Sequence, residues 1–174
     1  TRNSFGLTEA GGGSDAGATK TTAKSDGSTW VINGSKQFIT NSGTDITKLV
    51  TVTAVTGETD GRKEISSILV PVPTEGFTAE PAYNKVGWNA SDTHPLSFDD
   101  VRVPQENLLG ERGRGYANFL RILDEGRIAI AALSVGAAQG CVDESVKYAR
   151  EREAFGAAIG SYQAIAFKIA RIGI

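Results

Sequence analysis

The sequence predicts an α+β fold, in which an antiparallel β-barrel or two-sheet domain is followed by the first helices of an up-down helical bundle. Residues 18–104 form short segments rich in Thr, Val, Ile and aromatic residues, separated by Gly, Pro, Asn and Asp, a pattern typical of strands joined by turns. From Phe119 onward, apolar residues recur at the spacing of a helix face. Glycines and charges between these two patterns indicate a boundary, so we expect a β-domain at 1–110 and a helical domain at 111–174.

Two dipeptides in the first half predict hairpin turns. Asp26-Gly27 and Asn33-Gly34 stand between apolar segments, and such pairs tolerate the positive φ angles that tight hairpins need. We therefore expect residues 29–32 to pair with residues 36–40. Further strands are expected at residues 46–55, 65–72 and 96–101, with a surface loop at residues 55–63.

The second half predicts one long helix and a second helix after it. Apolar and small residues from Phe119 to Ser145 fall close to one helix face, and another helical pattern begins at about Ser161. Many intervening positions are Gly or Ala, which lets neighbouring helices approach closely. Two helices cannot enclose such a surface. Because the chain also contains no Met, we expect it to be an internal fragment of a longer protein.

Composition argues against several classes of function. The chain has 18 basic and 20 acidic residues, so it carries no basic stripe for nucleic acid. No apolar run approaches the ~20 residues needed to cross a bilayer, so no membrane partner is expected. No Cys/His cluster has the spacing of metal ligands, so no metal is expected. The single cysteine, Cys141, allows no intrachain disulfide and is expected to be a buried core residue. These features suit a reducing compartment, and we expect the bacterial cytoplasm, with the mitochondrial matrix as the alternative.

Three ring-bearing residues outside the motifs are expected to be structural. Trp30 and Trp88 are predicted to lie in the core or at the barrel rim, because no neighbouring residue suggests a stacked ligand. His94, the single histidine, precedes Pro95 in a turn-like stretch. We expect no catalytic role for it.

A glycine-rich stretch from Phe5 to Gly17 predicts a ligand-binding loop. Its glycines at 11–13 leave the backbone free to adopt positive φ and to present N–H groups to an anionic or flat ligand. Ser14 adds a hydroxyl. A phosphate-binding loop of the nucleotidase type would need a Lys-Ser or Lys-Thr pair and then a helix, whereas the Thr-rich segment that follows favours a strand. The alternative is an ordinary mobile turn.

The segment from Lys36 to Thr40 predicts a flat binding surface. Side chains alternate along a strand, so Phe38 and Thr40 share one face. An aromatic ring there can pack against a flavin, and the hydroxyl can hydrogen-bond to the ring nitrogen that takes up hydride. The alternative is cross-strand packing beside a surface threonine.

Charged residues in the helical half supply two further candidates. Asp124 and Arg127 are three apart on a helix, where the alternative is an ordinary surface salt bridge. Arg152 and Phe155 precede Gly156 at the turn between the two helices. The alternative there is a solvated run of charges.

The segment Leu7-Thr8-Glu9, followed by Gly-Gly-Gly-Ser-Asp, resembles the first signature of the acyl-CoA dehydrogenase family. The resemblance extends over essentially all 174 residues. Phe38 stands where family members often have Trp, and Ala10 stands where Pro is common. The other matching segments are Lys36 to Asn41, Asp100 to Pro104, Leu109-Gly110, Asp124 to Arg127, and Arg152 through Phe155-Gly156 to Tyr162-Gln163.

The resemblance implies an FAD-dependent enzyme that converts a fatty acyl-CoA thioester to the 2-enoyl-CoA and passes electrons to an electron-transfer flavoprotein. It also implies a homo-oligomer, a dimer or tetramer, in which Arg152 pairs with the pyrophosphate of a flavin held by another subunit. The nearest alternative is an acyl-CoA oxidase or a flavin monooxygenase on the same scaffold, and a more distant one is a non-enzymatic binding module. The implied cofactor-binding residues are Phe5, Leu7, Thr8, Ser14, Phe38, Ile39, Thr40, Arg152, Phe155, Tyr162 and Gln163, and the implied substrate-binding residues are Ser14, Asp124 and Arg127.

The resemblance places no catalytic base in this chain. The family uses a glutamate on the long helix just before the arginine matched by Arg127, or a glutamate far downstream. Gly126 occupies the first position, and Glu125 projects about 100° away around a helix. We therefore expect the base to lie after Ile174.

Overall fold

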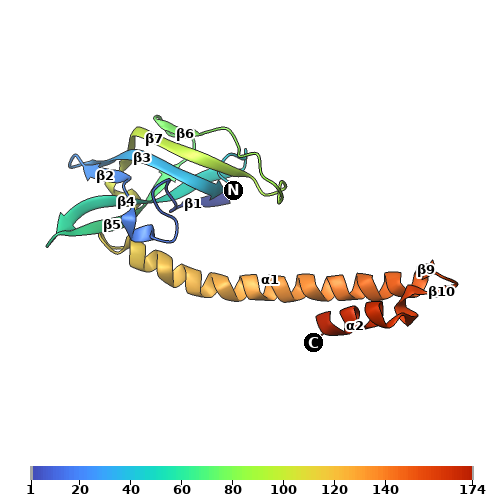
Figure 1. Ribbon diagram of the computed structural model, residues 1–174. Helices are drawn as coiled ribbons and strands as arrows, with labels where there is room; N and C mark the ends of the chain where they lie inside the picture. The colour runs from blue at the N-terminus through green and yellow to red at the C-terminus, as the bar shows by residue number, and fades with distance from the viewer. Residues whose placement is uncertain (1, 174) are drawn as a thin grey trace. The chain divides into compact units, whose positions relative to one another are not determined.

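The chain folds into two compact units, Thr1–Leu120 and Arg121–Ile174, in a computed structural model that describes residues 2–173. The first unit is built on an eight-stranded sheet, and the second is formed mainly by helices (Figure 1). Helix α1, Gly115–Glu151, begins in the first unit and continues into the second. This combination of sheet and helices confirms the α+β prediction.

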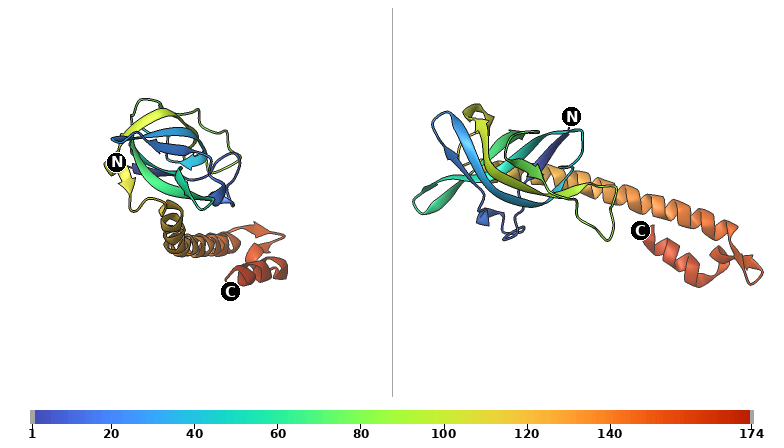
Figure 2. Two further views of the ribbon diagram at one scale, coloured as in Figure 1. Left: turned by 90° about the vertical axis from the view of Figure 1, so that its left-hand side faces the viewer. Right: turned by 90° about the horizontal axis from the view of Figure 1, so that it is seen from above.

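The sheet of the first unit has the strand order β6-β7-β3-β2-β4-β5-β8, with β1 paired to β4. Most neighbouring strands are antiparallel, as expected, and the sheet curls strongly in the views of Figure 2. The strands are β1 Arg2–Gly6, β2 Thr22–Ser25, β3 Thr29–Thr40, β4 Thr47–Thr59, β5 Arg62–Pro71, β6 Phe77–Ala79, β7 Thr93–Pro104 and β8 Leu108–Leu109, and two short 3-10 helices, η1 Ala16–Ala18 and η2 Gln105–Asn107, lie among them.

Strands β1 and β2 depart from the antiparallel pattern, because both run parallel to β4. Strand β1 pairs with β4 up to Gly6 opposite Val52, and β2 joins the same strand with Thr22 opposite Val55. The two short strands therefore follow one another along β4. Residues 7–21, which connect them, leave the sheet and carry the glycine-rich loop.

The Asp26-Gly27 turn is a hairpin turn between β2 and β3, as predicted. The Asp26 carboxylate accepts the N–H groups of Ser28 and Thr29, at 3.2 and 2.8 Å, and Gly27 has a φ of +102°. These hydrogen bonds hold the pKa of Asp26 well below its usual range. These hydrogen bonds lie within four consecutive residues, and Arg102 Nη1 adds a contact from β7 to Asp26 Oδ2 at 2.7 Å.

The prediction of a second hairpin at Asn33-Gly34 was wrong, because β3 runs without a break from Thr29 to Thr40. Gly34 has a φ of +143°, and the register with β7 shifts between Ile32 and Gly34, where Asp99 and Asp100 of β7 stand opposite Asn33, so the bulge lies in β7. The Asn33 side chain donates to Asp100 Oδ1 at 2.8 Å and accepts the Asp100 N–H at 3.0 Å. Pairing with a distant strand thus replaces the local turn.

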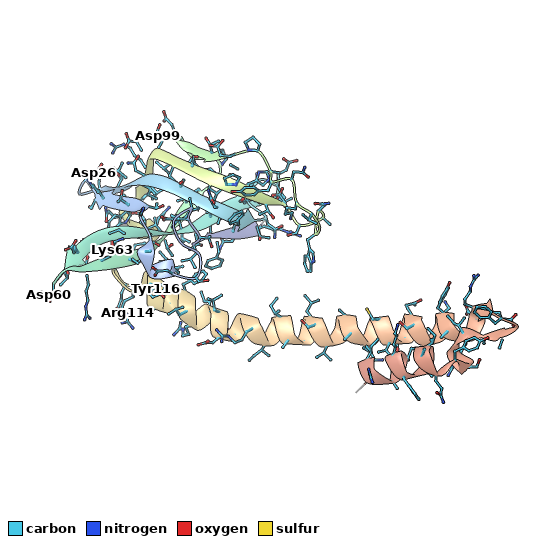
Figure 3. All side chains as sticks on the ribbon, viewed as in Figure 1. Asp26, Asp60, Lys63, Asp99, Arg114 and Tyr116 are labelled. Carbon is cyan, nitrogen blue, oxygen red and sulfur yellow. The ribbon has the colours of Figure 1, made fainter. Side chains whose placement is uncertain are left out.

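The expected surface loop at residues 55–63 is mostly strand. Strands β4 and β5 continue to a tight turn at Asp60-Gly61, where φ is +52° and +72°. Positive φ at both central residues matches the twist of paired strands. Asp60 marks this turn and Asp26 marks the β2–β3 turn in Figure 3.

The core of the first unit lies between the curled strands. It consists mainly of branched aliphatic side chains from β3, β4, β5 and β7, such as Ile32, Val52 and Val101, all 0% exposed. Trp30 is 2% exposed and belongs to this core, as predicted. Trp88 is not part of the core, because it is 81% exposed in the segment between β6 and β7, with a φ of +56°.

The second unit contains most of α1, a small hairpin and a second helix, as the helical pattern predicted. Strands β9, Glu153–Ala154, and β10, Ala157–Ala158, pair antiparallel, and η3, Ile159–Ser161, leads into α2, Gln163–Ile172. Ala149 is buried, but most residues of α1 are exposed. Cys141 is exposed as well, so the expectation of a buried core cysteine was wrong for the described residues.

Candidate functional site

The glycine-rich loop is organised by a tight turn. The Glu9 N–H donates to Gly12 O and the Gly12 N–H donates to Glu9 O, each at 3.1 Å. Gly12 tolerates no side chain, because a Cβ there would lie 2.8 Å from the carbonyl oxygen of Asp15. The conformation of the loop therefore depends on glycine at position 12.

The three glycines achieve this conformation without positive φ, so that part of the sequence interpretation was wrong. Gly11, Gly12 and Gly13 are absent from the positive-φ glycines of the described chain, which include Gly34 and Gly61. Glycine is needed at position 12 because the backbone of Asp15 lies close to it, and not because the residue has a positive φ.

An ion pair between Glu9 and Lys36 holds this loop against β3. Lys36 is 0% exposed, and its Nζ lies 2.8 Å from Glu9 Oε1. The Glu9 carboxylate also accepts the backbone N–H groups of Lys20 and Thr21, at 2.8 and 3.0 Å. The pair thus ties the start of the loop, its end and β3 together.

Burial and hydrogen bonding oppose each other in this pair. Burial raises the pKa of the Glu9 carboxyl, but hydrogen bonds from Lys36, Thr21 and Lys20 outweigh it and lower the pKa below its ordinary value. Burial lowers the pKa of the Lys36 ammonium, against the effect of Glu9. Sequence reasoning missed this pair, although Lys36 lies in phase with the inward-facing Trp30 and Ile32 along β3, which was a usable signal.

Phe38 is displayed on the surface by a bulge in β3, where Gln37 and Phe38 stand opposite Pro95. The register with β7 shifts between Lys36 and Ile39, and Phe38 has a φ of +59°. Its side chain is 60% exposed, and its ring centroid lies 4.9 Å from that of Tyr83 with the planes tilted by 34°. Thr40 is also exposed, whereas Ile39 is 3% exposed and packs in the core. Phe38 and Thr40 therefore share the outer face of this strand.

Three hydroxyl groups of the candidate residues are accessible to a ligand. Thr8 is half-buried, and Ser14 and Thr40 are exposed. The buried hydroxyls of Ser4 and Thr47 both donate to Asn41 O. In contrast, the hydroxyls of Thr8, Ser14 and Thr40 bond to no protein atom within residues 2–173.

The remaining candidates of the first unit lie at the end of β1. Phe5 is 41% exposed, and its ring centroid lies 5.7 Å from that of Phe119 in an edge-to-face arrangement. Leu7 is half-buried, and its carbonyl oxygen accepts a hydrogen bond from Lys36 Nζ. The structure thus brings the start of the glycine-rich loop and the Phe38 strand into direct contact.

His94 lies in β7, not in the turn-like stretch that the sequence suggested. Its Nε2 lies 2.6 Å from Asp92 Oδ1, and its Nδ1 lies 2.6 Å from Glu80 O. Burial lowers the pKa of His94, but these hydrogen bonds outweigh it and raise the pKa above its ordinary value. Both ring nitrogens are engaged, so the imidazole links the start of β7 to neighbouring segments.

The helical candidates Asp124 and Arg127 form a surface ion pair on α1. Arg127 Nη2 lies 3.3 Å from Asp124 Oδ1, and the two side chains are 72% and 73% exposed. At this exposure the pair contributes at most a few tenths of a kcal/mol, which leaves both groups available to a ligand. A Cβ added at Gly126 would meet nothing within 4 Å.

The four remaining candidates gather at one corner of the second unit. Phe155-Gly156 is the turn between β9 and β10, with φ values of +53° and +81° that suit a two-residue hairpin. Phe155 is 99% exposed, and its ring lies edge-to-face to Tyr162 with centroids 6.3 Å apart. The Tyr162 hydroxyl donates to Ala154 O at 2.7 Å. The exposed Arg152 follows the end of α1, and Gln163 begins α2.

Two classes of feature are absent from the part of the chain that the structure describes. Between residues 2 and 173, no helix combines the length and apolar character that crossing a membrane requires. The same residues contain no group of three or more His, Cys, Asp or Glu side chains that could hold a metal ion.

Comparison with known proteins matches both parts of the chain to domains of the same family. Residues 4–101 match the family model for the acyl-CoA dehydrogenase middle domain, and residues 113–174 match the model for the acyl-CoA dehydrogenase C-terminal domain.

Individual relatives agree with these matches. The chain is 51% identical over 168 residues to the "Probable acyl-CoA dehydrogenase YngJ" of Bacillus subtilis, covering 96% of this chain and 44% of that protein. It is 46% identical over 170 residues to the mitochondrial short-chain specific acyl-CoA dehydrogenase of Rattus norvegicus, covering 98% of this chain and 41% of that protein.

A solved structure extends the likeness to three dimensions. The acyl-CoA dehydrogenase of Bacillus anthracis in complex with FAD superposes with a TM-score of 0.90 and 37% identity, over 97% of this chain and 28% of that one. The chain thus spans less than half the length of each of these relatives. Both family models, the sequence relatives and the shared fold show that the chain belongs to the acyl-CoA dehydrogenase family.

Proposed function

We propose that the whole protein is an FAD-dependent dehydrogenase of fatty acyl-CoA thioesters. The observation that carries this proposal is the display of Phe38. A left-handed backbone is costly for an aromatic residue and tends to persist at functional sites. Here it places the ring on the surface beside Thr40 while Ile39 fills the core.

The residues present fit a flavin. Phe38 and Tyr83 together offer an apolar aromatic surface on which a flat ring system can pack. The unengaged hydroxyls of Thr8 and Thr40 offer hydrogen bonds to the polar edge of such a ring. The FAD complex of the Bacillus anthracis relative supports the choice of FAD among flavins.

Bound FAD would supply the acceptor for the hydride that leaves the β-carbon of a fatty acyl-CoA as its α-proton is removed, which gives the 2-enoyl-CoA. Phe38 would cover one face of the flavin and exclude water, and Thr40 would donate a hydrogen bond to it. Phe5 and Leu7 would line the same site, and Ile39 would line it through its backbone. Ser14 would reach a phosphate of FAD or of the acyl-CoA.

The second unit would bind the substrate and complete a neighbouring cofactor site. Asp124 and Arg127 suit the amides and phosphates of coenzyme A. Arg152, with Phe155, Tyr162 and Gln163, would meet the FAD of another subunit in a dimer or tetramer. In this proposal residues 1–110 act as the middle β-domain and residues 111–174 as the start of the helical domain. We further propose an electron-transfer flavoprotein as electron acceptor and a cytoplasmic or mitochondrial-matrix location.

The proposal is tested by reconstituting the purified whole protein with FAD and adding a fatty acyl-CoA. We expect bleaching of the flavin absorbance, followed by rapid reoxidation with electron-transfer flavoprotein and slow reoxidation with O₂. Rapid reoxidation by O₂ would instead indicate an oxidase or monooxygenase. A protein that binds no FAD would be a binding module.

Replacing Thr40 by Val tests the proposed hydrogen bond to the flavin. Loss of a buried partner costs about 1–3 kcal/mol, so we expect flavin reduction by acyl-CoA to slow by about 5- to 150-fold in stopped-flow measurements. Thr40→Ser keeps the hydroxyl and should remain close to wild type. A wild-type rate in Thr40→Val would remove Thr40 from the site.

Replacing Arg152 by Ala tests the proposed contact between subunits. Because one guanidinium would bind a pyrophosphate across the interface, FAD retention and oligomer mass should fall together. Gel filtration with light scattering and flavin absorbance measures both. Arg171→Ala, which removes an exposed arginine from the last turn of α2, is the control and should change neither. If Arg152→Ala keeps both its FAD and its mass, Arg152 is only a surface charge.

A further inference from the structure

Lys36 is the largest of the fully buried side chains, and its ammonium group lies where three segments meet. Its Nζ donates to Leu7 O at 3.1 Å, to Glu9 Oε1 at 2.8 Å and to Thr53 Oγ1 at 3.2 Å. The three acceptors match the three donors of an ammonium group. Burying a charge is unfavourable unless it is paired and hydrogen-bonded in this way, so the arrangement specifies lysine at this position.

These contacts join the two segments that carry the proposed flavin site. The Lys36 side chain holds Leu7 and Glu9, and the backbone N–H of Gln37 donates to Thr8 O at 2.8 Å. Phe38 follows directly along β3. Closer to the backbone, Lys36 Cγ lies 3.4 Å from where a Cβ on Gly6 would be. The segment that leads into the glycine-rich loop therefore packs on the side chain of Lys36, two residues before Phe38.

We propose that Lys36, held by Glu9, is a positioning residue that fixes Leu7 and Thr8 relative to the ring of Phe38. This inference rests on the proposed flavin site. Without the ammonium group, the segment from Leu7 to Glu9 would be joined to β3 only by the hydrogen bond from the Gln37 N–H to Thr8 O. Its carbonyl and hydroxyl groups would then shift against Phe38, and every contact to a ligand between them would change.

The test uses the purified whole protein and compares FAD binding with folding stability. The variants are Lys36→Met, which keeps the length of the side chain, Glu9→Gln, and the double variant. The control is Lys63→Met, because Lys63, labelled in Figure 3, also donates to a backbone carbonyl, Thr19 O at 2.9 Å, but contacts neither segment of the site. The readouts are the FAD dissociation constant, the visible absorption spectrum of bound FAD, and the thermal unfolding midpoint.

We expect Lys36→Met to raise the FAD dissociation constant at least tenfold and to shift the flavin spectrum, with a smaller change of the same kind in Glu9→Gln. The double variant leaves no unpaired buried charge, so its unfolding midpoint should recover toward wild type, while FAD affinity and spectrum stay altered. Lys63→Met should leave both flavin properties unchanged.

Recovery of FAD affinity together with stability in the double variant would show that Lys36 acts only on folding and would overturn the inference. Wild-type affinity and spectrum in a folded Lys36→Met would do the same. If Lys36→Met does not fold, Glu9→Gln and the double variant decide the question. A wild-type protein that binds no FAD would overturn the proposed function itself, and this inference with it.

Discussion

Removing the catalytic base should slow flavin reduction by about 10²–10⁴-fold, because a positioned base typically supplies that factor. We propose that the base lies outside residues 1–174. Gly126, on α1 beside Arg127, has no proton acceptor. Glu125 is exposed and projects about 100° from that position. A scan of glutamate-to-glutamine variants beyond residue 174 in the whole protein should find one that keeps FAD and CoA binding and loses turnover.

Two variants on α1 act as controls for this prediction. Glu125→Gln should leave flavin reduction by acyl-CoA unchanged. Gly126→Glu should be tolerated, because a Cβ there meets nothing within 4 Å, and it should restore part of the activity when combined with loss of the downstream base. Loss of reduction in Glu125→Gln, with every downstream variant active, would place the base on this helix instead.

Replacing Gly34 by Ala should lower the free energy of unfolding by about 2–6 kcal/mol, the sum of backbone strain and overpacking. A side chain at this φ of +143° is strained, and its Cβ would lie 2.6 Å from Thr21 Oγ1 and 2.8 Å from Thr21 Cα. The Thr21 carbonyl oxygen accepts a hydrogen bond from the Val55 N–H, and the Thr21 N–H donates to the Glu9 carboxylate. The backbone of Thr21 therefore has little freedom to move. Urea or thermal unfolding measures the loss.

Gly27→Ala is the matched control for this experiment. Gly27 also has positive φ, at +102°, but a Cβ there meets nothing within 4 Å. Gly27→Ala should therefore lower the free energy of unfolding through backbone strain alone, by about 1–3 kcal/mol. This loss should be smaller than that of Gly34→Ala. Equal losses for the two variants would mean that the close approach to Thr21 does not contribute.

Features defined by a few neighbouring residues were predictable from the sequence. The Asp26-Gly27 turn forms as expected because the hydrogen bonds from Ser28 and Thr29 to Asp26 join neighbouring residues. The two helices follow from their periodicity. That Phe38 and Thr40 share a face follows from alternation, but the bulge between Lys36 and Ile39, which the sequence did not predict, turns that face outward.

Features that depend on distant partners were not predictable in the same way. Asn33-Gly34 has the residues of a hairpin turn, but Asp100 offers Asn33 two hydrogen bonds across the sheet and the strand continues. The Glu9–Lys36 pair joins residues 27 apart, and neither residue alone shows that it is buried. Trp88 has a large aromatic side chain of the kind often found in a core, yet it is exposed and has a positive φ.

The pairing of β3 with β7 has a consequence for the nascent chain. The Trp30 indole donates to Gln105 O, 75 residues later, and at about 5–20 residues per second the ribosome needs about 4–15 s to make that stretch. During this time one edge of β3 has no native partner and can pair with another chain. The bulge at Phe38 and the positive φ of Gly34 interrupt this edge at two points, which shortens the straight segments available for such pairing. The distortion that presents Phe38 in the folded protein would thus also limit aggregation of the protein while it is being made.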